Sequence, residues 1–288
     1  MIAPALILSQ VKALPALASS ALRLGELARD ERSAAADFEQ VVRPDPALTA
    51  NLLRVANSAY FGLRCRADSV RQAITLLGVK RVSDLAAAVA LAPVIPARLP
   101  GYDVEASAFW LHSVAVATLA ERLAAQLRRP CPELTFTAGL LHDMGKLAIG
   151  SFVGDAAGEI LAHVRGGLPF VSAERAVLGV DHGEVGGLVA EAWSLPPAAA
   201  AAARWHHAPG DAPDDTCRPV VDLVHAADAL AHALGLGADA GELARSVDAG
   251  VEARLGVRAR DLEATAGGTL DDIHELAALF LRQPGGTP

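Results

Sequence analysis

Histidines and acids interrupt several stretches of the chain that are otherwise apolar. The clearest case is the segment GLLHDMGKL at 139–147, where His142 and Asp143 are neighbours in a stretch that is expected to be helical. Burial of an imidazole and a carboxylate is costly unless each has a partner, and a divalent cation is a partner for both. On its own, this pair is weak evidence for a metal site.

Five further side chains of the same two types occur in similar surroundings. They are His112, His182, His206, His207 and Asp228. Together with His142 and Asp143 they would form a set of nitrogen and oxygen donors without thiolate, which suits iron, manganese or zinc. A carboxylate such as Asp143 can bridge two cations, and two cations bind a phosphate ester and lower the pKa of a shared water. We therefore expect one or two divalent ions, with Asp143 as a catalytic residue if the site hydrolyses phosphate esters.

Lys146, one turn beyond His142, has two interpretations. It would steady a phosphate oxygen at such a site as a second catalytic residue, or it is a charge near the end of a helix. A single histidine at a helix end is more often an ordinary polar residue than a ligand. We interpret four histidines in that way: His163, His225, His232 and His274.

The elements that must position these residues are predicted to be helices. Alanine and leucine supply most of the apolar volume in a chain that is 52% hydrophobic and 4% aromatic, and both residues favour helix. No alternating pattern of useful length indicates a strand. Apolar spacing and end signals predict helices over 14–29, 33–42, 46–56, 69–77, 82–91, 106–127, 133–147, 172–192, 197–207, 219–234, 239–255 and 270–282. Asp45 is expected to cap the helix that follows it.

At 288 residues the chain has room for one large or two modest domains. Three prolines and a glycine in 93–101 mark the best candidate for a linker. We expect an all-α fold with an N-terminal helical subdomain over 1–100, packed on a helical subdomain over 101–235 that holds the metal site. A C-terminal helical extension is expected over 236–288.

Charge is unevenly divided along the chain, although the total is −8. Residues 1–100 hold 12 Lys and Arg against 8 Asp and Glu, whereas residues 101–288 hold 13 against 25. A basic run at 64–81 could contact phosphate. Because no aromatic residues interleave with it and the whole chain is acidic, we interpret the run as a solvated face or a surface between domains, and nucleic acid is not the expected partner.

Membrane and export signals are missing from the sequence. No stretch of about 18 uncharged apolar residues predicts a membrane span, and residues 1–14 do not have the pattern of a secretory signal peptide. The cysteines, Cys65, Cys131 and Cys217, are widely spaced and form no CxxC pair, which fits buried or incidental thiols. We expect a cytoplasmic protein with no membrane partner.

Several motifs occur in the order and spacing of a known family. They are DPALT at 45–49, LLRVANSAYFG at 52–62, SVRQAI at 69–74, FWLHS at 109–113, AGLLHDMGK at 138–146, DHGEVG at 181–186, WSLP at 193–196 and HHAP at 206–209. Together they resemble the HDOD domain, the HD-related output domain of bacterial signalling proteins. The resemblance extends over about residues 14–230.

The resemblance implies an all-α fold in two helical parts, related to the HD phosphohydrolases and to the HD-GYP cyclic dinucleotide phosphodiesterases. It places His112, His142, Asp143 and Asp228 at the positions of the basic HD metal set, and His182, His206 and His207 at those that supply a second ion in HD-GYP-like proteins. HDOD members are commonly regarded as signalling modules in which the metal residues have often decayed. This sequence retains them.

Two departures limit the activity that the resemblance implies. After His207 the sequence is Ala208-Pro209-Gly210, without the glutamate and the Gly-Tyr-Pro signature associated with cyclic di-GMP hydrolysis, so that substrate is not expected. Residue 108 is alanine where some HD-GYP proteins have a glutamate for an additional ion, so a third ion is not expected. No receiver, sensory or GGDEF domain is recognised, and inputs are expected from ligands or separate proteins.

Two functions therefore stay open. The first is a signalling or regulatory protein with a retained metal site, which acts by binding a signalling protein or a nucleotide-like ligand. The second is an active metal-dependent phosphohydrolase or phosphodiesterase that acts on a nucleotide-like phosphate ester. In the second, Asp143 would bridge the ions, water would be the nucleophile and Lys146 would hold the phosphate.

Overall fold

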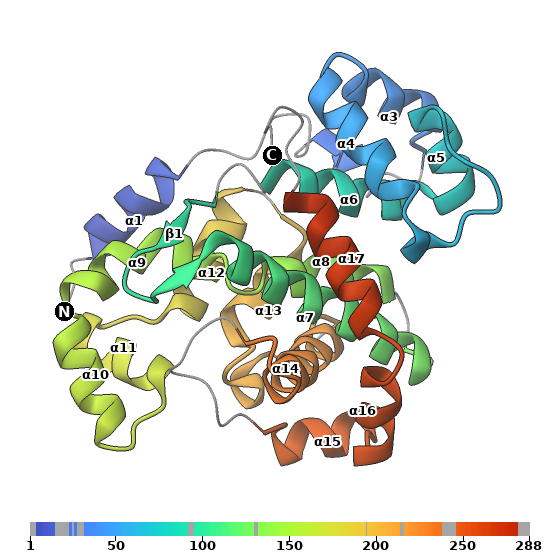
Figure 1. Cartoon of the computed structure of the whole chain (residues 1–288). Helices are drawn as coiled ribbons and strands as arrows, with labels where there is room; N and C mark the ends of the chain where they lie inside the picture. Colours follow the sequence, from blue (N-terminus) through green and yellow to red (C-terminus); the bar gives the residue numbers. More distant parts are fainter. Residues whose placement is uncertain are drawn as a thin grey trace. The chain divides into compact units, whose positions relative to one another are not determined.

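The structure of the chain is a computed structural model (Figure 1). It describes residues 4–14, 23–24, 26–27, 32–91, 95–129, 132–193, 195–213, 216–237 and 246–281. The described residues are mostly helical, with two strands of two residues each, which confirms the all-α prediction. Most of the predicted helix over 14–29 and the first part of the one over 239–255 lie outside the described residues.

Contacts divide the chain into two compact units. One contains Met1–Pro15 and Ile95–Thr269, and the other contains Ala16–Val94 and Leu270–Pro288. The chain changes unit within the proline-rich segment that is expected to be a linker. Whether 1–100, 101–235 and 236–288 behave as separate domains is not tested by this division, so the three-part organisation stays a prediction.

The smaller unit is built from short helices. Its described elements are α3 (Ala35–Val42), α4 (Pro46–Ala56), the 3-10 turn η1 (Ala59–Phe61), α5 (Val70–Leu77), α6 (Val79–Leu91) and α17 (Leu270–Leu281). The side chain of Asp45 accepts a hydrogen bond of 2.9 Å from the Leu48 N–H, as expected for the cap of α4. Glu275 on α17 accepts one from the Ala59 N–H at the start of η1. The C-terminal helix thus packs with α4 and η1 in this unit.

The larger unit holds all of the candidate metal ligands. Its described elements are α1 (Pro4–Ala13), β1 (Arg98–Leu99), β2 (Val104–Glu105), α7 (Ala106–Gln126), α8 (Pro132–Leu141), α9 (Gly145–Asp155), α10 (Ala157–Arg165), α11 (Phe170–Leu178), α12 (His182–Ala192), α13 (Pro197–Trp205), η3 (Pro209–Asp211), α14 (Arg218–Ala233), α15 (Ala249–Leu255) and α16 (Ala259–Ala266). The two strands pair antiparallel, Arg98 with Glu105 and Leu99 with Val104. This ladder is too short to produce an alternating pattern in the sequence.

Helix α7 is buried along most of its length. It packs against α8, α14 and α16, while α13 packs against α8, α12 and α14. Its apolar residues face several directions at once, which is typical of a helix inside a core. At the edge of this core, Arg254 of α15 donates hydrogen bonds of 2.7 and 2.8 Å to the two carboxylate oxygens of Asp222 on α14.

The predicted continuous helix over 133–147 is wrong. Helix α8 ends at Leu141 and α9 begins at Gly145, so that residues 142–144 form a turn. The cause is tertiary packing, because α9 approaches α12 so closely that a Cβ on Gly145 would overlap the carbonyl oxygen of His182. The turn releases the His-Asp pair from helical geometry, in which neighbouring side chains point about 100° apart.

The predicted helix over 172–192 is also two helices. Helix α11 stops before Gly179, and α12 begins at His182 with Asp181 as its N-cap. The Oδ1 atom of Asp181 accepts a hydrogen bond of 2.8 Å from the Glu184 N–H. Like the first break, this one places a candidate ligand at a helix end, where a few backbone angles set the direction of its side chain.

No described helix, taken singly, is long and apolar enough to cross a bilayer. One pair, Thr135–Asp155 with Ala157–Arg165, meets the criteria of length and composition only when its two parts are joined, and those parts are bent by 93° at the break.

Gly145→Ala should destabilise the larger unit, because the added methyl group overlaps the backbone of α12. Overpacking of this kind costs about 1–3 kcal/mol, and each kcal/mol lowers the Tm by about 2–4 °C in a domain of this size. Thermal unfolding followed by circular dichroism measures the shift. Gly158→Ala on α10 is the matched control, since open space surrounds Gly158 and its Tm should stay the same or rise. Equal Tm values for the two variants would contradict the packing argument.

Candidate metal centre

The seven candidate ligands meet inside the larger unit. They come from α7, the turn between α8 and α9, the first residue of α12, the turn after α13, and α14. Their donor atoms form two groups, within each of which all atoms lie within 4.8 Å of one another. The first group is Asp143, His182, His206 and His207, and the second group is His112, His142 and Asp228.

The carboxylate of Asp143 lies between the two groups. Its Oδ1 is 3.4 Å from Nε2 of His182 and 3.6 Å from Nε2 of His206. Its Oδ2 is 3.5 Å from Nε2 of His142 and 3.8 Å from Nε2 of His112. One carboxylate therefore faces nitrogen donors of both groups, which is the placement of a bridging ligand.

The imidazoles are oriented by hydrogen bonds at the ring nitrogen that faces away from the centre. Nδ1 of His142 lies 2.7 Å from the carbonyl oxygen of Gly139. The Nδ1 atoms of His112 and His206 also face carbonyl oxygens, at 3.0 and 2.9 Å. Because a carbonyl oxygen only accepts, each Nδ1 carries the proton and each Nε2 presents its lone pair to the centre.

His182 is held by a carboxylate instead of a carbonyl. Its Nδ1 lies 2.7 Å from Oε2 of Glu174 on α11. The other oxygen of Glu174 accepts a hydrogen bond of 2.5 Å from the hydroxyl of Tyr102. Glu174 is fully buried and also accepts from the backbone N–H of His182. These contacts fix the direction in which the His182 ring points toward Asp143.

Burial and charge act in opposite directions on the titrating groups. Burial lowers the pKa of His142 to about 3, against the opposing effect of Asp143, so this imidazole is neutral. Burial also acts to lower the pKa of His182, but the Glu174 carboxylate outweighs it and raises this pKa to about 9. Burial acts to raise the pKa of Asp143, yet Lys146 and the imidazoles outweigh it and hold that pKa well below its ordinary value.

Lys146 is buried beside Asp143, with Nζ 2.7 Å from Oδ2. Its ammonium group also lies 5.5 Å from the centre of the Tyr102 ring. Lys146 falls in the first turn of α9, where the helix dipole disfavours a cation. The Asp143 carboxylate, and not the helix end, therefore accounts for the position of this charge.

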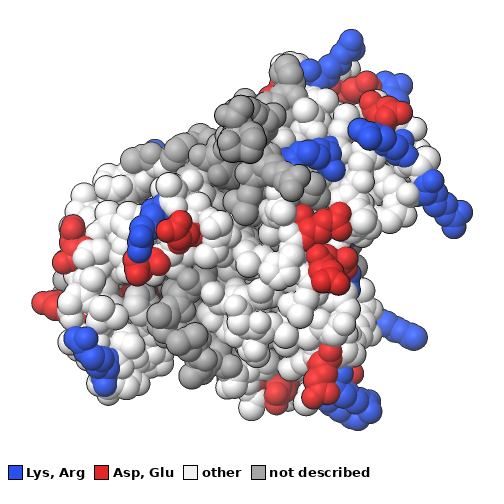
Figure 2. Space-filling view, viewed as in Figure 1, with Lys and Arg blue, Asp and Glu red and all other residues white. Residues whose placement is uncertain are grey.

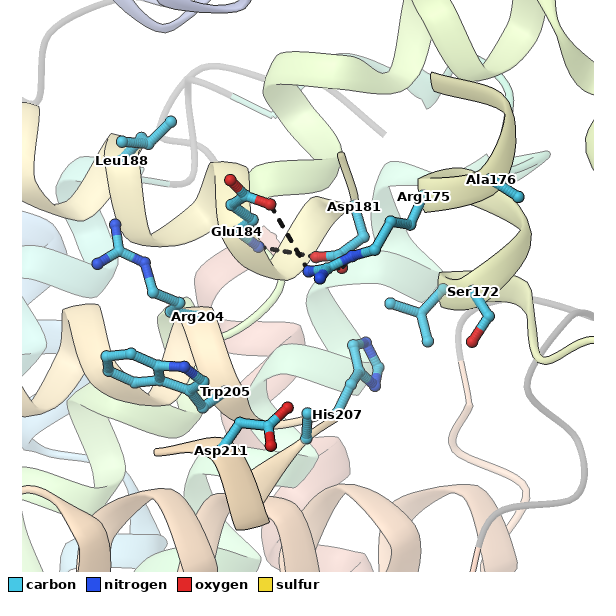
Figure 3. Close-up of a pocket in the computed structure, with 12 residues that line it drawn as sticks. Ser172, Arg175, Ala176, Asp181, Glu184, Leu188, Arg204, Trp205, His207 and Asp211 are labelled. Carbon is cyan, nitrogen blue, oxygen red and sulfur yellow. Dashed lines mark hydrogen bonds and ion pairs between the residues drawn. The ribbon is translucent and has the colours of Figure 1, made fainter. Parts of the chain in front are cut away.

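A pocket of about 700 Å³ reaches the centre at His207 (Figure 3). It is lined by Val171, Ser172, Arg175, Ala176, Asp181, Glu184, Leu188, Arg204, Trp205, His207, Ala208 and Asp211. Nε2 of the half-buried His207 lies 2.6 Å from Nε2 of His182, so the ring of His207 belongs to both the pocket and the centre. The other six candidate ligands are at most 1% exposed. A molecule in the pocket therefore meets the centre at His207.

Charges of both signs line this pocket. Arg175 donates two hydrogen bonds to the Asp181 carboxylate, and an ion pair joins it to Glu184 (Figure 3). The guanidinium group of Arg204 lies 5.5 Å from the centre of the Trp205 ring. Arg204 also forms an ion pair of 3.0 Å with Glu191, and Asp211 adds a third acid to the lining, so the described lining carries no excess of positive charge.

The donor atoms fit a divalent cation. Oδ1 of Asp143 and Nε2 of His206 are buried and have no hydrogen-bond partner among the described residues. A buried polar atom left in this state costs about 1–3 kcal/mol. A cation is a partner for both atoms, which lie 3.6 Å apart. The set of imidazole nitrogens and carboxylate oxygens suits iron, manganese or zinc.

All residues that the sequence predicts as ligands thus lie together. Among the histidines interpreted as ordinary polar residues, His163 and His274 are exposed, and His225 has its Nδ1 2.7 Å from the carbonyl oxygen of His206. His232 is the exception, because its side chain is buried on α14 next to Asp228.

Two residues of the site, Glu174 and Tyr102, are not among those that the sequence predicts. Glu174 had a signal in the sequence, since it lies with Phe170, Ala173 and Leu178 on the buried face of α11 at helical spacing. An acid on an apolar face needs a partner. Tyr102 is preceded by a predicted linker and had no such signal.

Comparison with known proteins supports a family relationship. The HDOD domain model matches residues 14–209. The fold is similar to that of a "Putative phosphohydrolase" from Shewanella amazonensis SB2B, with 26% identity, a TM-score of 0.73, and coverage of 97% of this chain and 98% of the other. It is also similar to an HDOD domain protein with unknown function from Geobacter sulfurreducens, with 24% identity, a TM-score of 0.76, and 98% of each chain covered. An uncharacterized protein of Treponema pallidum (strain Nichols) is 25% identical over 228 residues, which are 76% of this chain and 42% of that protein, so the chain spans less than half of that relative.

Glu174→Gln should weaken metal binding by about 10–100-fold, which is the usual cost of losing a carboxylate that orients a ligand histidine. The amide keeps the shape of the side chain but loses the charge that holds Nδ1 of His182. Competition against a chromophoric chelator measures the affinity. Glu159→Gln on α10 is the control, because this exposed side chain lies outside both donor groups. The same affinity in both variants would show that Glu174 has no orienting role.

Proposed function

The chain belongs to the HDOD domain family, and we propose that it is a regulatory protein of bacterial signal transduction whose metal centre binds a phosphate-containing ligand. The observation that carries this proposal is the convergence of imidazoles from four chain segments on the buried Asp143 carboxylate, next to a pocket that reaches the centre at His207. One or two ions of iron, manganese or zinc would be held by the two donor groups. A nucleotide-like ligand or a signalling protein is the proposed partner, and the expected location in the cytoplasm stays a prediction.

The centre is buried, and the pocket leads to it. Six of the seven candidate ligand side chains are at most 1% exposed, and among the described residues a pocket reaches the centre from the side of His207. The ammonium group of Lys146 lies on Asp143 and is not among the groups that line the pocket. The positive charges that do line it belong to Arg175 and Arg204, which are paired with Asp181, Glu184 and Glu191, so a phosphate in the pocket would have to share them with these carboxylates.

A second candidate function is hydrolysis of a nucleotide-like phosphate ester. It is favoured by the position of Asp143, whose two oxygens face different donor groups. Bound metal would supply charge stabilisation of the phosphate and a water of lowered pKa. The protein would contribute imidazoles oriented by hydrogen bonds, a neutralising cation in Lys146 and a set of buried donor side chains. Asp143 and Lys146 would have catalytic roles in this second function, and not in the first.

No nucleic-acid partner is proposed. Within the basic run at 64–81, Arg66 lies 3.7 Å from the Asp68 carboxylate, and Arg71 forms an ion pair of 2.7 Å with Glu39 of α3. In the view of Figure 2, acidic and uncharged side chains separate the Lys and Arg side chains over the part that holds α3 to α5. This face offers no continuous positive surface to a phosphate backbone.

The purified protein should contain stoichiometric metal, and Asp143→Asn should lose most of it, because the bridging charge between the two groups is removed. Elemental analysis measures the metal content. Asp155→Asn, at an exposed position of α9, should retain the metal. Wild-type protein that cannot be loaded with iron, manganese or zinc would contradict the proposed function.

The two candidate functions differ in turnover. Metal-loaded protein is titrated calorimetrically with mononucleotides, cyclic nucleotides and dinucleotides, and product release is followed for the same compounds. Metal-dependent binding without product supports the regulatory function, whereas product release that Asp143→Asn abolishes supports hydrolysis. If no member of the panel binds, the partner is not a nucleotide.

A further inference from the structure

His225 belongs to neither donor group, yet it is bonded to the segment that carries two of the candidate ligands. It lies on α14, three residues before Asp228. Its Nδ1 is 2.7 Å from the carbonyl oxygen of His206. Its Nε2 accepts a hydrogen bond of 3.0 Å from the backbone N–H of Asp248, which is the N-cap of α15. The half-buried ring of His225 therefore joins the turn after α13 to the start of α15.

The two contacts require the same form of the His225 ring. A carbonyl oxygen only accepts a hydrogen bond, so Nδ1 carries a proton and donates it to the His206 carbonyl. A backbone N–H only donates, so Nε2 has no proton and accepts from Asp248. Two partners on different segments thus specify one neutral tautomer, in which each ring nitrogen has its own task.

The carbonyl group that His225 holds belongs to the peptide unit between His206 and His207. Helix α13 ends at Trp205, so this carbonyl lies at a helix end, where carbonyl groups lack a partner within the helix. A peptide unit is planar, and both flanking Cα atoms lie in its plane, so a contact to its oxygen restrains the backbone of both residues.

Both residues that flank this peptide unit depend on its position. Nε2 of the buried His206 lies 3.6 Å from Oδ1 of Asp143. His207 is in the same donor group, and its ring centre is 3.8 Å from that of His206. His207 also lines the pocket. One hydrogen bond from α14 therefore acts on two candidate ligands and on a wall of the pocket.

We propose that His225 is a positioning residue of the metal centre, which holds the segment of His206 and His207 through its Nδ1 hydrogen bond and binds no metal itself. This inference rests on the proposed metal binding. It goes beyond that proposal because it gives a role to a histidine that the sequence indicates to be an ordinary polar residue.

Two amide variants separate the two hydrogen bonds of His225. In His225→Asn the amide nitrogen is as many bonds from Cα as Nδ1 is, so it can donate to the His206 carbonyl but does not reach Asp248. In His225→Gln the amide oxygen is as many bonds from Cα as Nε2 is, so it can accept from Asp248, but no donor remains at the position of Nδ1.

Metal affinity should fall by about tenfold in His225→Gln, the lower end of the usual effect of groups that orient ligands. It should stay at the wild-type value in His225→Asn and in His163→Gln, since His163 is exposed on α10. Chelator competition measures the affinities, and circular dichroism confirms that the variants are folded. An equal loss in the Asn and Gln variants, a loss in the Asn variant alone, or no loss in either would overturn the proposal.

Imidazole ¹⁵N NMR of the Zn(II)-loaded protein identifies the ligands that are affected. In His225→Gln the resonances of His206 and His207 should shift more than those of His112 and His142, which are in the second group. Equal shifts in both groups would indicate a general loss of structure and would contradict a positioning role. If all variants bind metal as well as wild-type protein does, His225 positions nothing while the proposed function stands. If wild-type protein binds no metal, both proposals fall.

Discussion

The charge of Asp143 is buried at 1% exposure, and the centre is organised around that charge. Removal of a carboxylate from water costs several kcal/mol unless close partners compensate. Lys146 supplies one partner at 2.7 Å, and the imidazoles of the two donor groups supply polar surroundings on both sides of the carboxylate. Since Lys146 is itself buried, each of the two charges depends on the other, and the position of one fixes that of the other.

Helix ends, and not helix middles, supply most of the groups around that carboxylate. His142 and Asp143 follow the end of α8, His182 opens α12, and His206 follows α13. At a helix end the backbone offers carbonyl groups that lack a partner within the helix, and these accept from Nδ1 of the histidines. The same geometry that ends the helices thereby selects the ring nitrogen that faces the centre.

Local sequence singled out the candidate ligands, which the structure brings together, because their chemistry is visible residue by residue. An imidazole or a carboxylate in an apolar stretch needs a partner wherever the stretch packs, so His112, His142 and Asp228 stand out without a structure. The break at residues 142–144 does not stand out. It depends on the approach of α9 to α12 at Gly145, which is a contact between segments far apart in the sequence.

The same distinction accounts for the residues that the sequence did not reveal. Glu174 lies on the buried face of α11, yet its partners Tyr102 and His182 are known only once the helices are packed. His225 resembles an ordinary polar residue until α13 and α15 are packed against α14. Residues whose type is unusual for their local sequence can be identified from the sequence. Residues whose role depends on a packed neighbour are identified only from the structure.

His207 is one wall of the pocket and also a member of the first donor group. A cation that turns or polarises this ring alters what the pocket holds, and an occupant of the pocket alters how well the ring serves the cation. Thermodynamic reciprocity requires the two effects to be equal in size. Under the proposed function, the protein would respond jointly to two concentrations, that of the ion and that of the small molecule.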